Sequence, residues 1–180
     1  MLKLGFNALL GAIFSLGIVG AAQADRSEGE TMARQGVVRC GATSHLRQGG
    51  SEVHFTNLNL RNFGAAPITI ERLRFFDATG ALLFDTAGGG LPPAENGVLG
   101  PANNTLAPNQ TAQFSTLDIL SFLPNEQRPI QAEIQWSASQ SVLTLGASAT
   151  RLVRQRDPGT GNVLQERSRD ANPCRSIFLK

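Results

Sequence analysis

Apolar and polar residues alternate from residue 53 onward, which is typical of half-buried β-strands. Apolar side chains stand at Val53 and Phe55 and then, one position out of phase, at Leu58 and Leu60. A shift by one residue turns every following side chain to the opposite face of a sheet. We therefore expect a β-bulge at Thr56-Asn57 that keeps all four side chains in the core.

The run from Ile68 to Phe75 has the same phase change and predicts a second irregularity at Glu71-Arg72. A short Gly-Ala-Ala-Pro connection separates the two runs. The segment 77–80, Asp-Ala-Thr-Gly, then has Asp and Gly at the positions typical of a type I turn. We expect residues 51–81 to form the best-specified hairpin of the fold, followed by a returning strand at 81–84.

Further strands are predicted where apolar residues alternate or cluster between turn-forming residues. Residues 131–136 alternate cleanly, with Ala132, Ile134 and Trp136 on one face and Gln131, Glu133 and Gln135 on the other. A last hairpin is expected from strands at 149–156 and 163–167 around a turn at 157–162. Shorter strands are expected at 37–40, 111–114 and 142–145, and residues 117–123 form either one or two helical turns or a link between strands.

Loops are expected at 41–50, which contains His45, and at 85–110, which is rich in Gly, Pro and Asn. A loop as long as the second is uncommon in a compact domain and is usually functional or mobile. Seven to nine short strands and at most one short helix predict an all-β fold, an antiparallel β-sandwich. An α/β sheet would need amphipathic helices between its strands.

The first 24 residues have the pattern of a cleaved signal peptide. Lys3 gives the positive start, Ala8 to Val19 is apolar, and Ala22-Gln23-Ala24 fits a cleavage site. The alternative is a retained membrane anchor, although the apolar stretch is short for a span. We expect a flexible lead at 25–35 and one domain at 36–180, with no membrane span after cleavage and a location in the periplasm or outside the cell.

Cys40 and Cys174 are the two cysteines of the chain. In an oxidising compartment we expect them to form a disulfide between the start and the end of the domain. The alternative is a redox-active or metal-binding pair, but the sequence has neither a C-x-x-C spacing nor a histidine beside them. The sequence predicts no metal site and no cofactor.

The formal net charge of +2 gives no general attraction to nucleic acid or to an anionic membrane. Arginines are nevertheless concentrated in the C-terminal hairpin and could bind an anionic glycan, a phosphate or an acidic protein. The alternative is cross-strand pairing, such as Glu166 with an arginine, and ordinary solvation. The candidate binding residues are Arg151, Arg154, Arg156, Arg167 and Arg169.

The two histidines, His45 and His54, are the only other candidates for chemistry. His54 is opposite in parity to Val53 and Phe55, so we expect it to face solvent. A metal site that combines both histidines with an acid such as Glu52 has no recognised ligand spacing. Because no nucleophile motif is present either, the sequence predicts no catalytic residue.

The segments LNLRNFGAAPITIERLRFFDATGALL and LAPNQTAQF, with the Ile134-Gln135-Trp136 strand, resemble immunoglobulin-like sandwich domains of uncharacterised secreted bacterial proteins. The resemblance covers residues 53–137 and implies an immunoglobulin-like β-sandwich. It implies no particular activity, because many functions use this scaffold. The cysteines lie near the two ends of the domain, so the inter-sheet bridge of true immunoglobulin domains is not carried over.

The predicted function is non-enzymatic binding of another secreted protein or of a cell-envelope component. Loops on a rigid scaffold often carry binding, so the loop at 86–110 is one candidate site and the arginine-rich hairpin is another. Two alternatives stay open: a secreted hydrolase or metal-binding enzyme that uses His45 and His54, and a structural module of the envelope. The sequence does not determine the partner or the oligomeric state.

Overall fold

The computed structural model describes residues 32–87, 90–120, 127–143 and 145–178. These residues form β-strands, one α-helical turn and one 3₁₀ turn (Gln48–Gly50), which confirms the prediction of an all-β fold. The strands are β1 (Met32–Gly41), β2 (Ser44–Arg47), β3 (Glu52–Arg61), β4 (Ile68–Phe76), β5 (Leu82–Asp85), β6 (Thr105–Leu106), β7 (Thr111–Ser115), β8 (Gln131–Leu143), β9 (Gly146–Arg156), β10 (Val163–Pro173) and β11 (Arg175–Phe178), and the helix is α1 (Thr116–Ile119).

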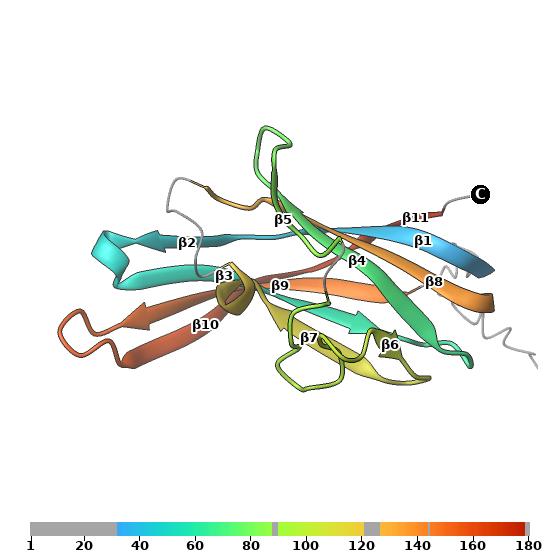
Figure 1. The fold of residues 1–180 in the computed structure, drawn as a ribbon. Coiled ribbons are helices and arrows are strands. Elements are labelled where there is room, and N and C mark those ends of the chain that lie inside the picture. The colour runs from blue at the N-terminus through green and yellow to red at the C-terminus, as the bar shows by residue number, and fades with distance from the viewer. Residues whose placement is uncertain (1–31, 88–89, 121–126, 144, 179–180) are drawn as a thin grey trace, which may run out of the picture.

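The strands form two antiparallel sheets that pack face to face as a sandwich (Figure 1). The six-stranded sheet has the order β11-β1-β8-β4-β5, with β6 on β4. The five-stranded sheet has the order β10-β9-β3-β2, with β7 on β3. The described residues contain more strands than the predicted seven to nine, because β2, β6 and β11 are too short to show alternation.

The two runs expected to form one hairpin belong to different sheets. β3 pairs with β9, β2 and β7, whereas β4 pairs with β8, β5 and β6, so the predicted pairing is wrong. The connection between them crosses from sheet to sheet around Asn62, which is fully buried. The Asn62 side-chain amide donates to the carbonyl oxygens of Ala66 (2.8 Å) and Leu106 (3.0 Å) and accepts from the Gly64 amide (2.8 Å). These bonds satisfy the buried backbone of the crossing.

Only one of the two predicted bulges is present. The register of β4 on β8 shifts between Ile70 and Arg72, as the phase change predicts. β3 instead pairs with β9 without interruption from Glu52 to Arg61, so the prediction of a bulge at Thr56-Asn57 is wrong. The first half of β3 is buried on both faces, and the Arg154 guanidinium covers Phe55 at 4.8 Å from the ring centroid. Alternation does not reveal a strand that is covered on both sides.

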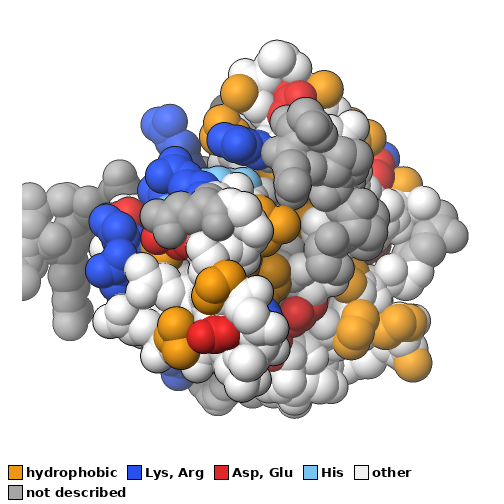
Figure 2. All heavy atoms as spheres, turned by 90° about the vertical axis from the view of Figure 1, so that its left-hand side faces the viewer, with side chains coloured by type: hydrophobic (Ala, Val, Ile, Leu, Met, Phe, Trp, Pro, Cys, Tyr) orange, Lys and Arg blue, Asp and Glu red, His pale blue; other side chains and the backbone are white. Residues whose placement is uncertain are grey.

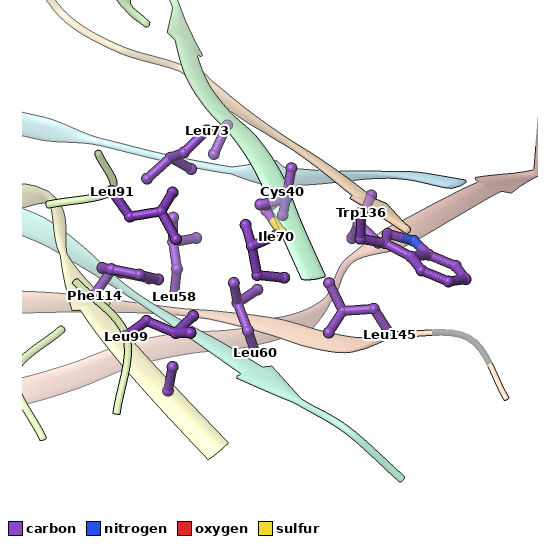
Figure 3. Packing of buried hydrophobic residues seen from close by; sticks show 14 of the residues in the cluster. Cys40, Leu58, Leu60, Ile70, Leu73, Leu91, Leu99, Phe114, Trp136 and Leu145 are labelled. Carbon is purple, nitrogen blue, oxygen red and sulfur yellow. The ribbon is translucent and has the colours of Figure 1, made fainter. Parts of the chain in front are cut away.

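The core lies between the sheets and includes part of the expected loop. Ala132, Ile134 and Trp136 face this core, which confirms the predicted faces of β8, and Leu58, Leu60 and Phe114 meet them from the other sheet (Figure 3). Leu91, Leu99 and Leu106 are also buried there. The long segment after β5 is therefore packed against the core in its described residues, and it contains β6.

The remaining predictions of turns and ends have mixed outcomes. The turn at Asp77–Gly80 and the β9–β10 hairpin are confirmed. For the ambiguous segment 117–123, the structure shows one helical turn at Thr116–Ile119, and residues 121–123 lie outside the described residues. The prediction of a loop at 41–50 is wrong, because this range contains β2. The predicted flexible lead at 25–35 is also too long, because β1 begins at Met32. The predicted signal peptide lies outside the described residues. No helix among the described residues is long and apolar enough to cross a membrane.

The cysteine prediction is confirmed. Cys40 and Cys174 form a disulfide with an S–S distance of 2.07 Å. Cys40 lies near the end of β1 in the six-stranded sheet, and Cys174 lies where the chain passes from β10 to β11. The bond therefore ties the last crossing between the sheets to the first strand.

Candidate functional site

A polar region lies on the inner face of the five-stranded sheet, where β2, β3, β9 and β10 run side by side (Figure 1). On β9, Arg151 stands between Ala149 and Val153, which are both buried, so all three side chains share the inner face. The registers align Arg151 with Thr56 of β3 and with Asp170 of β10. The neighbouring row on the same face is apolar and pairs Leu58 of β3 with Ala149 of β9.

A hollow of about 330 Å³ lies beside this row. It opens between the five-stranded sheet and the segments around the end of β1 and the start of β8. Its polar lining comes from Thr43, Thr56, Arg151, Asp170 and Asn172, and the rest from Gly41, Ala42, Pro129, Ile130 and Ala149. The hollow therefore has a charged wall and an apolar wall, as small-molecule sites commonly have.

A hydrogen-bonded chain of three residues holds Arg151 in place. The Arg151 guanidinium lies 3.1 Å from Nδ1 of His54, and His54 Nε2 lies 2.6 Å from Oε1 of Glu52. A guanidinium can only donate, so Nδ1 accepts and Nε2–H donates to the carboxylate. The hydrogen bond from His54 holds the pKa of Glu52 below its usual value. His54 is thus a neutral bridge between a carboxylate and a guanidinium.

His45 stacks on this chain. Its ring lies 4.5 Å from that of His54, at an interplanar angle of 16°. Arg47 Nε donates to His45 Nε2 (3.1 Å), so the other ring nitrogen carries the proton and faces the Thr43 hydroxyl at 3.1 Å. Burial, followed by the nearby charges, lowers the pKa of His45 to about 4, and His45 is therefore neutral at pH 7.

Positive charge collects around His45. The charges of Arg128, Arg47 and Arg151 each add to the effect of burial in lowering the pKa of His45. Figure 2, which faces the left-hand end of Figure 1, shows arginine side chains gathered over one part of the surface beside a visible histidine. This part of the molecule therefore favours a ligand with an anionic group.

The five predicted binding arginines are not one cluster. Arg154 points to the opposite face from Arg151 and pairs with Glu166 (2.6 Å), as the alternative of cross-strand pairing predicts. Arg156 donates to the carbonyl oxygen of Gly161 (3.2 Å) in the hairpin turn. Arg167 and Arg169 are exposed on β10, which is an edge strand. Of the five, Arg151 is the one that lines the hollow.

The two histidines are brought together, but not as the sequence analysis expects. His54 is 2% exposed, so the prediction that it faces solvent is wrong. The β2–β3 ladder sets His45 directly opposite His54, a contact hidden by the expectation of a loop at 41–50. Among the described residues, no group of three or more His, Cys, Asp or Glu could hold a metal ion. Both ring nitrogens of His54 are engaged in hydrogen bonds.

Comparisons with known proteins add little to this geometry. No family model matches the chain, and no curated protein matches it. A solved structure titled "Crystal Structure of Thermotoga maritima 1070" is similar at 15% identity, with 82% of this chain and 95% of that chain covered and a TM-score of 0.37. A similarity of this size carries neither fold nor function to this chain.

Proposed function

We propose that this chain is a non-enzymatic binding protein of the periplasm or the extracellular space. Its partner is another exported protein or a component of the cell envelope. We place the binding site in the hollow beside Arg151. The observation that carries the proposal is a positive charge on the wall of the hollow that no carboxylate of the described residues neutralises by direct contact.

The hydrogen bonding of Arg151 supports a ligand at this position. One of its terminal nitrogens is bound to a neutral imidazole, and its Nε is buried without an acceptor. Arg74 of the six-stranded sheet also has a buried Nε without an acceptor, but Arg74 pairs with Glu133. Arg151 differs because it lies on the wall of a hollow and forms no direct ion pair with a described carboxylate. A ligand acceptor would bind a terminal N–H of Arg151, because the enclosed Nε cannot be reached from the hollow.

The long loop at 86–110 is a weaker candidate. Leu91, Leu99 and Leu106 bury this segment in the core, which gives it a structural role. This segment also lines a hollow of about 270 Å³, but that lining contains no basic residue, whereas the hollow beside Arg151 has both charges and an apolar wall. The proposal therefore moves the site from the loop to the inner face of the five-stranded sheet.

Photo-crosslinking in the exporting cell tests this proposal. A photoreactive amino acid is placed at Asn172 in the hollow and, as a matched control, at Thr79 in the exposed β4–β5 turn. We expect a covalent adduct with a discrete partner from position 172 and none from position 79. If neither position gives an adduct, the proposal is wrong and the structural module becomes the better explanation.

The enzyme alternative has its own test. Because both ring nitrogens of His54 are occupied, a hydrolase or metal-binding role would require this hydrogen bonding to open. Metal content and hydrolysis of ester, peptide and glycoside substrates are measured for the purified protein and for H45Q/H54Q. A signal that disappears in the double variant would favour the enzyme over the binding protein.

A further inference from the structure

The hollow contains two opposite charges that do not pair with each other. Arg151 and Asp170 are direct partners in the β9–β10 ladder, so their Cβ atoms are expected to be about 5 Å apart. Both line the hollow, yet no ion pair joins these two described residues. His54 accounts for this arrangement, because its hydrogen bond with Arg151 directs the guanidinium along β3 and away from β10.

A bulge in β10 brings the acid into this position. The register of β10 on β9 shifts between Ser168 and Asp170, so Arg169 is the extra residue and Asp170 stands opposite Arg151. Without that shift, the residue after Ser168 would occupy the position, and two arginines would face each other. Bulges often redirect a side chain beside a functional site. This bulge places a negative charge next to a positive one.

Buried residues support the positive charge. Glu52 is 8% exposed and His54 is 2% exposed. His54 accepts a hydrogen bond from Arg151 and in turn donates one to Glu52, and neither residue lines the hollow. Such a second layer keeps a binding side chain in one geometry and lowers the entropy lost on binding. Glu52 and His54 therefore act as positioning residues.

The rest of the hollow suits a small organic body. Ala42, Pro129, Ile130 and Ala149 give an apolar surface, and the volume of about 330 Å³ is at the lower end of the roughly 300–1,000 Å³ of small-molecule sites. A bare anion would use the arginine alone and would be repelled by Asp170. A molecule with a carboxylate at one end and an ammonium at the other would use both charges.

We infer that the hollow binds a zwitterionic ligand, the α-carboxylate and α-ammonium of an amino acid or a short peptide. Arg151 takes the carboxylate and Asp170 takes the ammonium. The inference rests on the proposed binding function and specifies the chemistry of its ligand. Thr43, Thr56 and Asn172 add neutral polar groups to the lining, although the hydroxyls of Thr43 and Thr56 already take part in hydrogen bonds within the protein.

Titrations followed by two-dimensional ¹H–¹⁵N NMR test this inference with whole and half ligands. The probes are L-alanine and L-alanyl-L-alanine, which carry both charges, acetate, which has only the carboxylate, and ethylammonium, which has only the ammonium. We expect at least one zwitterion to shift the amide resonances of Thr56, Arg151 and Asp170 with a Kd at least tenfold below that of either half ligand, because each lost charged hydrogen bond costs about a factor of ten.

Two variants and a matched control separate the two charges. R151Q should weaken the zwitterion at least tenfold, and D170N should weaken the zwitterion while leaving acetate unchanged or tighter. R154Q is the control, because Arg154 is the same residue type on the same strand but faces away from the hollow. Asp170 is exposed, so we expect D170N to fold. Titration of D170N therefore still tests the inference if R151Q does not fold.

Three results would overturn the inference: acetate that binds as tightly as the zwitterions, a zwitterion that binds more tightly to D170N, or the absence of binding by every probe. The first two would make the hollow a site for simple anions. Crosslinking at Asn172 reports separately on the binding function. An adduct there together with failed titrations would contradict only the ligand chemistry, whereas the absence of an adduct would contradict the proposed function.

Discussion

Two charged clusters, one in each sheet, are built from similar residues and differ in what they leave unpaired. In the six-stranded sheet, Glu133 of β8 lies between Arg39 of β1 and Arg74 of β4 and pairs with both. In the five-stranded sheet, Glu52 pairs with His54, and His54 with Arg151. In the first cluster two arginines surround one carboxylate. In the second, a neutral ring separates the carboxylate from the arginine.

This difference shows why a buried charge network alone does not identify a site. The Glu133 cluster lies on the outer face of its sheet and forms a ladder of direct contacts, a common way to neutralise a buried carboxylate. The Glu52 cluster ends at a hollow with the positive charge of Arg151 on its wall. In the first cluster the arginines contact the carboxylate directly, whereas in the second no described carboxylate contacts Arg151 directly.

The largest effect is expected from the disulfide, which connects β1, a strand of the Glu133 cluster, to the link between β10 and β11. C40A/C174A should lower the free energy of unfolding by about 2–5 kcal/mol, because the bond closes a very long loop in the unfolded chain. Urea unfolding measures it, with the reduced wild-type protein as the control. A loss below about 1 kcal/mol would show that strand pairing alone holds the sheets together.

The next largest effect is expected at Glu133. E133Q leaves Arg39 and Arg74 facing a neutral amide, and it should lower the free energy of unfolding by about 2–3 kcal/mol, less than for a fully buried pair because Arg39 is half exposed. The matched control is E71Q, the same change at an exposed position on β4. Equal losses in the two variants would contradict a structural role for the Glu133 cluster.

A smaller loss is expected from the cluster beside the hollow. H54F fills the space of the imidazole but removes both of its hydrogen bonds, and it should lower the free energy of unfolding by about 1–2 kcal/mol. Urea unfolding compares it directly with E133Q. A loss larger than that of E133Q would indicate that the second cluster is as structural as the first.

Acid should lower the stability of the protein through His45, which stacks on His54 of the Glu52 cluster, in a defined pH range. The pKa of His45 is about 4 in the folded protein and 6.5 as its ordinary value, so the unfolded chain takes up the proton first as pH falls. The stability should therefore fall from pH 6.5 to about pH 4 and stop responding to His45 below that. Urea midpoints at pH 7 and pH 4.5 check this, and H45N should show a smaller drop than the wild type.

The six-stranded sheet should respond at lower pH. The Arg72 side chain lowers the pKa of Asp85 to about 2 from an ordinary value of 3.8, so its contribution is present above pH 3.8 and is lost as pH falls through 2. D85N should lower the urea midpoint at pH 7. Between pH 4 and pH 2, the midpoint of D85N should fall less than that of the wild type. An identical acid response of D85N and wild type would contradict this assignment.

The local sequence pattern was sufficient to predict strands with one buried and one polar face, and turns that depend on a few neighbouring residues. β8 has one buried and one polar face, so its alternation predicts which side chains enter the core. The turns at 77–80 and 157–162 are determined by Asp and Gly within a few residues. The disulfide follows from the presence of two cysteines in a chain whose first residues predict export.

The sequence by itself thus determined the all-β class, the turns at 77–80 and 157–162 and the pairing of the cysteines, because each depends on the general residue pattern, on residues close in the chain or on a single pair. The tertiary structure decided which strands pair, since a connection as short as 62–67 can either reverse within a sheet or cross to the other one. It also decided the site. Glu52, His54, Arg151 and Asp170 come from three strands. Only their registers, with one bulge, bring Arg151 and Asp170 to one hollow and set His54 and Glu52 behind Arg151.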